Sequence, residues 1–148
     1  MQKLKILNKK QIKKLLNELE EIYDYRLELK DYIFFKSSKD KVYILSKKFS
    51  EINDKELRIN NLGLYFGKFQ KNFFRLSIEG AQMIKPKKNY YILDDKEKDL
   101  WMKGQDFDIK KEYSGPIILF YNDDIFGCGV AKGKRLLNSV PKERRIKN

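Results

Sequence analysis

The C-terminal part of the chain alternates short apolar runs with turn residues, and this pattern restricts the fold more than any other feature of the sequence. The most apolar run, 116–121, is followed by turn residues at 122–124 and by a second run at 125–130. A shorter run lies at 90–93, and we expect a turn at 94–98 and a further strand at 101–104. Short strands at regular spacing predict a small barrel or sandwich.

The N-terminal part has a different periodicity. Apolar residues spaced by three and four along 11–29 predict an amphipathic helix, with Asn8 as its N-cap. The runs 32–35 and 42–45 flank a polar turn and predict an antiparallel pair packed on this helix. The other elements expected here are a short helix at 47–59, a glycine-punctuated stretch at 62–69, a strand at 73–78 and a helical turn at 79–84.

Pro86 and the lysines around it interrupt the pattern and predict a domain boundary. We therefore expect an α+β fold: a mixed α/β domain at 1–86, with a helix on antiparallel strands, and a β domain at 87–148. The 20 aromatic residues (ten Phe, nine Tyr, one Trp) require a packed core and argue against a disordered chain.

The charge balance favours a polyanionic partner. The 148 residues include 33 Lys and Arg against 21 Asp and Glu, a net charge of +12. Such a chain attracts polyanions, of which nucleic acid is the commonest. The alternative explanation is a compositional bias toward lysine, as in heat-adapted proteins.

The absence of histidine and the single cysteine exclude several kinds of site. The chain has no His and no pair of cysteines, so it lacks the usual zinc ligands, the usual general base and an intramolecular disulfide. No apolar stretch approaches 18 residues, and the basic N-terminus lacks an apolar signal core. We expect a cytoplasmic protein that has no membrane partner, metal or cofactor.

The last eighteen residues are the strongest candidate for an RNA contact. They carry seven positive groups against the single acid Glu143, and arginine donates paired hydrogen bonds to phosphate. Val140, Pro141 and Ile146 are spaced as if this segment packs on the barrel, although a solvated basic tail is the alternative. The predicted RNA-binding residues are Lys132, Lys134, Arg135, Lys142, Arg144, Arg145 and Lys147.

Two further groups of residues are candidates for binding. Lys68 and Arg75 are candidates for a second RNA or partner contact, beside aromatic residues at 65–74 that could stack on bases but fit a core better. Six lysines between Lys3 and Lys14 fit either a second RNA contact or a solvated helix face.

Catalytic and metal-binding alternatives are weaker. Cys128 lies between two glycines in an expected strand, which favours a buried structural cysteine over a nucleophile. The acidic cluster 94–99 is interleaved with lysines and fits a solvated loop better than a metal site. We expect no enzymatic activity and no small-molecule substrate.

The sequence resembles a known family. The blocks 40–46, 62–69 and 74–76, together with the strand pair 115–129, look like the two-domain ribosome-biogenesis factors called Nip-seven. Its C-terminal part resembles the PUA domain, named for pseudouridine synthases and archaeosine transglycosylases. The ending around Arg144 is similar to the archaeal form and also to PUA modules attached to RNA cytosine-C5 methyltransferases.

This resemblance implies an N-terminal domain that docks partner proteins and a PUA pseudo-barrel that binds RNA during maturation of the large ribosomal subunit, with pre-rRNA and ribosome assembly proteins as the expected partners. A second hypothesis is an RNA-recruiting subunit acting in trans for a cytosine-C5 methyltransferase or guanine transglycosylase. A third is a protein–protein adaptor whose basic charge is incidental.

Overall fold

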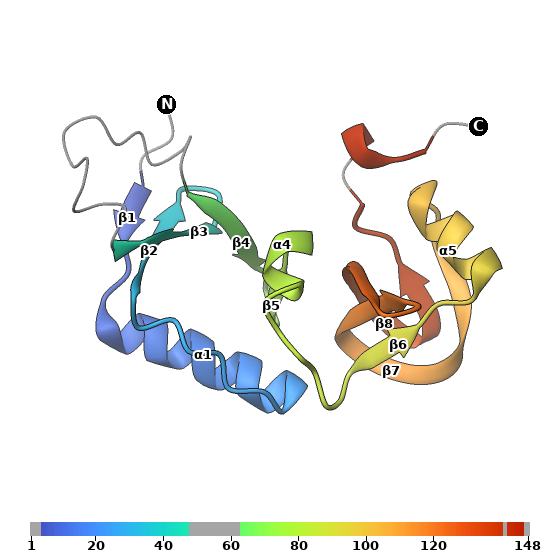
Figure 1. Ribbon diagram of the computed structural model, residues 1–148, viewed down its shortest axis with the longest axis horizontal. Coiled ribbons are helices and arrows are strands. Elements are labelled where there is room, and N and C mark those ends of the chain that lie inside the picture. The colour runs from blue at the N-terminus through green and yellow to red at the C-terminus, as the bar shows by residue number, and fades with distance from the viewer. Residues whose placement is uncertain (1–3, 48–62, 141, 147–148) are drawn as a thin grey trace.

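The computed structural model describes residues 4–47, 63–140 and 142–146. Figure 1 shows two lobes joined by the chain around residues 85–89. The N-terminal lobe contains β1 (Leu4–Ile6), α1 (Lys9–Tyr23), β2 (Tyr32–Ser37), β3 (Lys41–Ser46), β4 (Leu64–Phe69), β5 (Phe74–Leu76) and α4 (Ile78–Ala81). The C-terminal lobe contains β6 (Tyr90–Ile92), α5 (Asp95–Met102), β7 (Phe107–Tyr121), β8 (Asp124–Leu137) and the 3-10 helix η1 (Lys142–Arg144).

Helix α1 begins at the predicted N-cap. The Asn8 side chain accepts a hydrogen bond of 2.8 Å from the backbone N–H of Gln11, whose own side chain accepts from the Asn8 N–H at 2.9 Å. This reciprocal pair satisfies two N–H groups that a helix start leaves without partners. The apolar face is buried at Leu15, Leu16, Leu19 and Tyr23.

The predicted end of this helix was wrong. Asp24 has a left-handed backbone conformation with φ 55°, which ends the helix at Tyr23 rather than at Leu29. Leu27 and Leu29 are nevertheless buried in the same core. The apolar pattern therefore continued past the helix because the following irregular segment packs against the same surface.

The N-terminal lobe is built on an antiparallel sheet with strand order β1-β2-β3-β4-β5. The predicted pairing of β2 with β3 is confirmed, with Phe34 opposite Ile44. The core against α1 includes Phe34, Ile44, Phe66 and Phe74, all almost fully inaccessible to solvent. The helix predicted at 47–59 lies outside the described residues beyond Lys47.

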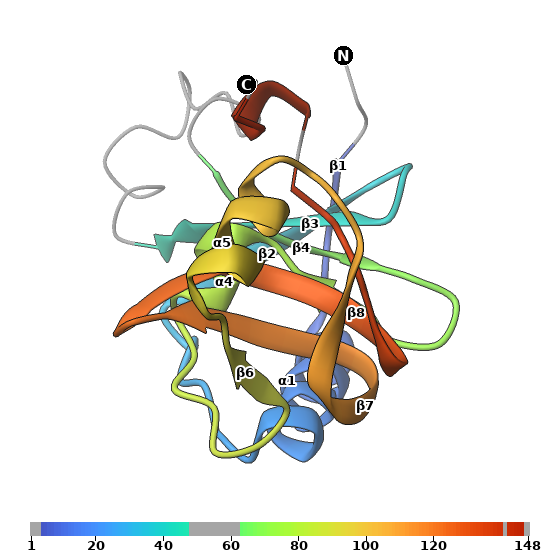
Figure 2. The ribbon, with the colours of Figure 1, turned by 90° about the vertical axis from the view of Figure 1, so that its right-hand side faces the viewer.

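The C-terminal lobe has a three-stranded sheet with the order β6-β7-β8. β6 pairs with β7 in parallel, and β7 pairs with β8 antiparallel over nearly the whole length of both strands. The predicted strands at 116–121 and 125–130 are confirmed. They are the portions of β7 and β8 nearest the connecting turn, and both strands continue beyond them as a longer curved ribbon (Figure 2). The α+β fold class is confirmed.

Around residues 117–119 and 127–129, the sheet of β7 and β8 is buried on both faces. Successive side chains of a strand point to opposite faces, and here Ile118 packs into the core of the N-terminal lobe while Ile117 and Leu119 pack into the core of the C-terminal lobe. Cys128, opposite Ile118, also joins the N-terminal core. The N-terminal core therefore contains residues from both sides of the boundary predicted at 86–87. A shared core does not show two independent domains, so the boundary stays a prediction.

The prediction of a turn at 94–98 and a strand at 101–104 was wrong, because α5 occupies this segment. The Asp94 side chain accepts from the Glu97 N–H at 2.7 Å, and Glu97 accepts from the Asp94 N–H at 2.9 Å, which forms a second capping box. Trp101, on the last turn, is 1% exposed and anchors α5 to the C-terminal core. None of the helices in the described ranges is long and apolar enough to cross a membrane.

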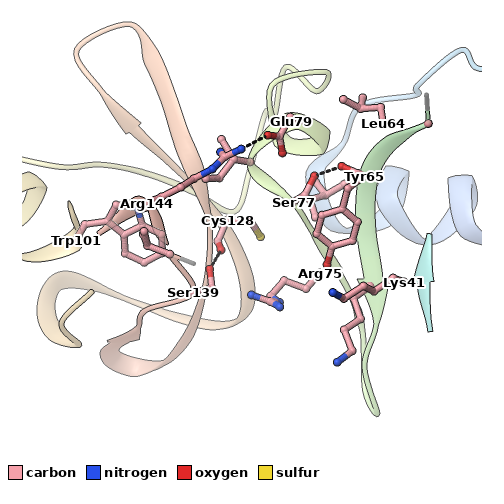
Figure 3. Close-up of a pocket in the computed structure, with 15 residues that line it drawn as sticks. Lys41, Leu64, Tyr65, Arg75, Ser77, Glu79, Trp101, Cys128, Ser139 and Arg144 are labelled. Atoms are coloured by element: carbon pink, nitrogen blue, oxygen red, sulfur yellow. Dashed lines mark hydrogen bonds and ion pairs between the residues drawn. The ribbon is translucent and has the colours of Figure 1, made fainter. Parts of the chain in front are cut away.

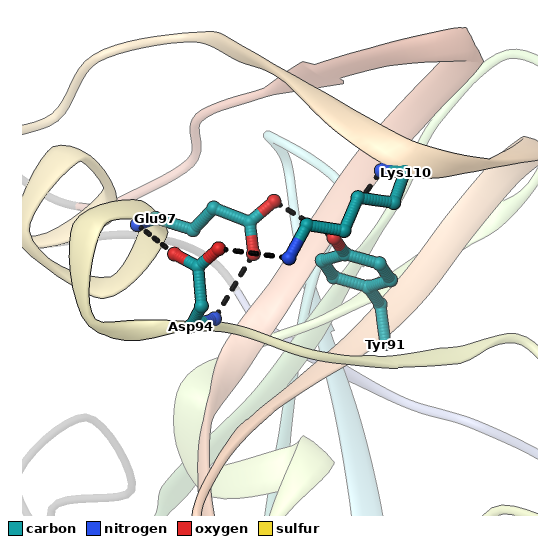
Figure 4. A network of polar contacts seen from close by, with 4 residues as sticks. All are labelled: Tyr91, Asp94, Glu97 and Lys110. Atoms are coloured by element: carbon teal, nitrogen blue, oxygen red, sulfur yellow. Dashed lines mark hydrogen bonds and ion pairs between the residues drawn. The ribbon is translucent and has the colours of Figure 1, made fainter.

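A polar network fixes α5 to the sheet (Figure 4). The Tyr91 hydroxyl donates to Glu97 at 2.7 Å and accepts from the Lys110 N–H at 3.2 Å. The Lys110 ammonium pairs with Asp94 at 3.0 Å. Burial, followed by the bond to Glu97, raises the pKa of Tyr91 to about 12.

We expect Tyr91→Phe to lower the free energy of unfolding by about 1–3 kcal/mol, because the substitution leaves the buried Glu97 carboxylate without one of its donors. The raised pKa adds stability that is complete below pH 10 and is lost as pH rises toward about 12, so the difference between wild type and variant should shrink over that range. Urea unfolding at several pH values measures it. Tyr113→Phe, which removes an exposed hydroxyl bonded to the Tyr90 carbonyl, is the control and should cost less.

Candidate nucleic-acid interface

The structure divides the predicted RNA-binding residues into two groups. Lys132, Lys134 and Arg135 are exposed near the C-terminal end of β8, and Arg135 pairs with Asp108 at 3.3 Å. Lys142, Arg144 and Arg145 belong to η1 and the residue after it. Lys147 lies outside the described residues.

Arg144 is already engaged in an ion pair. Its guanidinium donates a hydrogen bond of 2.7 Å to Glu79 of α4, so it ties the end of the chain to the N-terminal lobe. Burial alone would raise the pKa of Glu79, but hydrogen bonds from Arg144, the backbone and Ser77 outweigh it and hold the pKa below its ordinary value. The sequence predicts an RNA contact at Arg144, and the structure shows that this residue also bonds the C-terminal segment to the N-terminal lobe.

Arg145 is also part of the packing. Its Nε donates to the Val140 carbonyl at 3.0 Å, and its side chain lies directly over Gly104, where a Cβ would collide with it. Gly104 has φ +81°, a conformation that suits glycine. The predicted packing of this segment is confirmed at Val140, which is 5% exposed, but not at Ile146, which is 53% exposed.

The junction between the lobes contains a pocket of about 550 Å³, which we call the junction pocket. Its wall includes Arg144 and both residues predicted as a second contact, Lys68 and Arg75, together with Lys41. Figure 3 shows Arg75 reaching from β5 toward Cys128 and Ser139 on the opposite wall. Glu79 is the one acidic residue among the described residues of this wall.

Three of these cations form a row across adjacent strands. Lys41 of β3 lies opposite Lys68 of β4, which lies opposite Arg75 of β5. Like charges placed directly opposite one another destabilise a sheet. Lys41 lies 5.6 Å from the centre of the Tyr65 ring, but no described carboxylate is within ion-pair distance of any of the three.

Two buried side-chain nitrogen atoms of the described pocket residues lack hydrogen-bond partners. These are Nε of Arg75 and Nε1 of Trp101, both inaccessible to solvent. An unpaired buried donor costs about 1–3 kcal/mol, and more when it is charged. The junction pocket therefore combines excess positive charge with an arginine, Arg75, whose hydrogen-bonding capacity is not fully used within the described structure.

Cys128 forms part of the same wall, but its chemistry is that of a structural residue. It is buried, and burial raises the pKa of its thiol, so the protonated form predominates at neutral pH. The Tyr23 hydroxyl lies 3.6 Å from its sulfur. The predicted buried position of Cys128 is confirmed.

The acidic cluster at 94–99 has a structural use, since Asp94 and Glu97 cap α5. Within the described parts of the chain, no three His, Cys, Asp or Glu residues come together in a way that could hold a metal ion.

Of the aromatic residues at 65–74, Phe66 and Phe74 are core residues as predicted.

Sequence reasoning missed Lys41 and Trp101 as members of this site. The sequence pattern places Lys41 in a turn and Trp101 in a strand. The row of cations depends on strand register, which no local pattern specifies, whereas the capping box at Asp94 and Glu97 is a local signal that would have placed Trp101 on a helix.

Comparison with known families identifies the C-terminal lobe. Residues 88–146 match the model described as the methyltransferase RsmF PUA domain, so this part of the chain is a PUA domain of the RsmF methyltransferase type. The match does not name the Nip-seven factors. A comparison with curated proteins gave no match.

We expect Glu79→Gln to lower the free energy of unfolding by about 0.2–1 kcal/mol at pH 7, the usual range for a partly exposed ion pair. A lowered carboxyl pKa adds stability that is complete above the ordinary value of 4.5 and is lost as pH falls through the lowered pKa. The difference from wild type should therefore disappear in acid. Thermal unfolding from pH 3 to 7 measures it, with Glu112→Gln, an exposed acid outside any described ion pair, as control.

Proposed function

We propose that this protein binds structured RNA without catalysing a reaction on it. The observation that carries the proposal is the PUA domain at 88–146, a type of domain that suggests RNA binding, in a chain with a net charge of +12. The raised pKa of Cys128 and the absence of histidine argue against the common nucleophile and general base.

The best candidates for phosphate contacts are the exposed cations that hold no structural bond. Lys132, Lys134 and Lys142 are exposed and have no ion pair with any described acid. Arg135 has an exposed partner, Asp108, which RNA could displace at little cost. If about four groups neutralise phosphates of single-stranded RNA, raising salt from about 50 to 200 mM should weaken binding roughly fiftyfold.

Two cellular roles are compatible with RNA binding by this protein. The first is recruitment of RNA for a modifying enzyme, such as a cytosine-C5 methyltransferase or guanine transglycosylase, and the matched model favours it because its description names a methyltransferase. The second is assembly of the large ribosomal subunit and pre-rRNA processing, which rests on the resemblance to Nip-seven. In both roles the N-terminal lobe would dock a partner protein.

Affinity purification of the protein from cells separates the two roles. Stoichiometric recovery of an RNA-modifying enzyme supports recruitment, and recovery of pre-ribosomal particles with assembly factors supports the ribosomal role. If the purified protein has no measurable RNA affinity at physiological salt, the adaptor hypothesis replaces both.

We expect Lys132→Ala combined with Lys134→Ala to weaken RNA binding several-fold and to reduce the salt slope by about 1.4, since each lost phosphate contact on a single strand removes about 0.7. Fluorescence anisotropy with a labelled RNA at several salt concentrations measures both. The matched control is Lys39→Ala with Lys71→Ala, two exposed lysines of the N-terminal lobe. Equal losses in both double variants would contradict the assigned surface.

A further inference from the structure

We propose that the junction pocket binds one phosphate group, which the bound RNA supplies; the RNA source rests on the proposed function, whereas the phosphate site itself does not. The proposal starts from the charge row. Lys41, Lys68 and Arg75 face one another across three strands with no described carboxylate between them. An anion in the pocket would remove their mutual repulsion.

The donors in the pocket match the acceptors of a phosphate. The Arg75 guanidinium reaches across the pocket (Figure 3), and its Nε has no partner. Arginine suits phosphate because its planar group donates parallel hydrogen bonds to two oxygens. The unpartnered Nε of Arg75 and Nε1 of Trp101 are inaccessible to solvent, so the donors assigned to the phosphate are the rest of the Arg75 guanidinium and the ammonium groups of the two lysines.

The Arg144–Glu79 ion pair lies at the same pocket, and breaking it would free the charge of Arg144 for a ligand. Glu79 neutralises Arg144 while the ion pair is intact, so the excess charge lies on the opposite wall. Both members are partly exposed, with side-chain exposures of 51% and 32%, so the bond between them is weak enough to exchange. An incoming phosphate would compete with Glu79 for Arg144 and bring a fourth cation to the site.

The dimensions also fit. A volume of about 550 Å³ falls within the range of small-ligand sites, and it exceeds what a single ion needs. A phosphate held here would carry the rest of its nucleotide within the pocket or at its mouth. The lobe that contains Arg75 would thereby take part in RNA binding together with the PUA domain.

Trp101 provides a direct test, since it is the single tryptophan of the chain and lines the pocket. Inorganic phosphate is titrated into the full chain while tryptophan fluorescence is recorded, with potassium chloride at matched ionic strength and potassium acetate as a carboxylate control. We expect a saturable change with phosphate and none with chloride or acetate. Arg75→Gln should weaken the response at least about tenfold, and Arg26→Gln, which removes an exposed arginine that does not line the pocket, should leave it unchanged.

A second variant, Lys68→Gln, tests the site independently in case Arg75→Gln fails to fold. It removes the charge in the middle of the row, at a partly exposed position where the substitution should not disturb the core. Weakened phosphate binding in a Lys68→Gln protein with wild-type circular dichroism supports the site. Absence of any saturable response to phosphate in wild type overturns it. A phosphate response in Arg75→Gln and Lys68→Gln equal to that of wild type, or a wild-type response to acetate equal to that to phosphate, overturns it as well.

A short RNA oligonucleotide and a nucleoside monophosphate are then used as competitors of inorganic phosphate. Competition by the oligonucleotide supports RNA as the source of the phosphate. Competition by the monophosphate alone supports the phosphate site and overturns its connection to RNA. The RNA-binding proposal is tested separately through Lys132 and Lys134, so failure of one result does not imply failure of the other.

Discussion

The structure depends on the part of the β7–β8 ribbon, around residues 117–119 and 127–129, that is buried on both faces. Ile118 and Cys128 face the N-terminal core, and their neighbours Ile117 and Leu119 face the core beneath α5. A strand pair with two buried faces cannot separate from either lobe without exposing a core to water. This constraint makes the relative position of the lobes a property of the fold, and the junction pocket follows from it.

Helix α4 completes the junction, because this short element lies between the two sheets (Figure 1). Gly80 allows its close approach to β4, since a Cβ at this position would collide with the Phe66 carbonyl oxygen. The same helix carries Glu79, which receives the Arg144 side chain from the far end of the chain. The basic terminal segment is thus attached to both lobes, which distinguishes it from a solvated tail.

Local features of the sequence predicted much of the fold but little of the site. The periodicity after Asn8 gave α1, and the apolar runs gave the inner parts of β2, β3, β7 and β8. Features that depend on tertiary contacts were missed: α1 stops at Tyr23 because Asp24 turns the chain, while Leu27 continues the apolar pattern. The cations of the junction pocket lie far apart in the sequence, so only strand register and lobe packing bring Lys41, Lys68 and Arg75 together.

We propose that RNA contacts both the PUA domain and the junction pocket beside it. Ultraviolet crosslinking of the full chain to total cellular RNA at physiological salt, followed by mass spectrometry of the crosslinked peptides, tests it most directly. We expect crosslinks in the peptides that contain residues 132–135 and 142–146, with further crosslinks at β4 and β5. Crosslinks confined to the lysines of α1, or no crosslinks at all, would contradict this account.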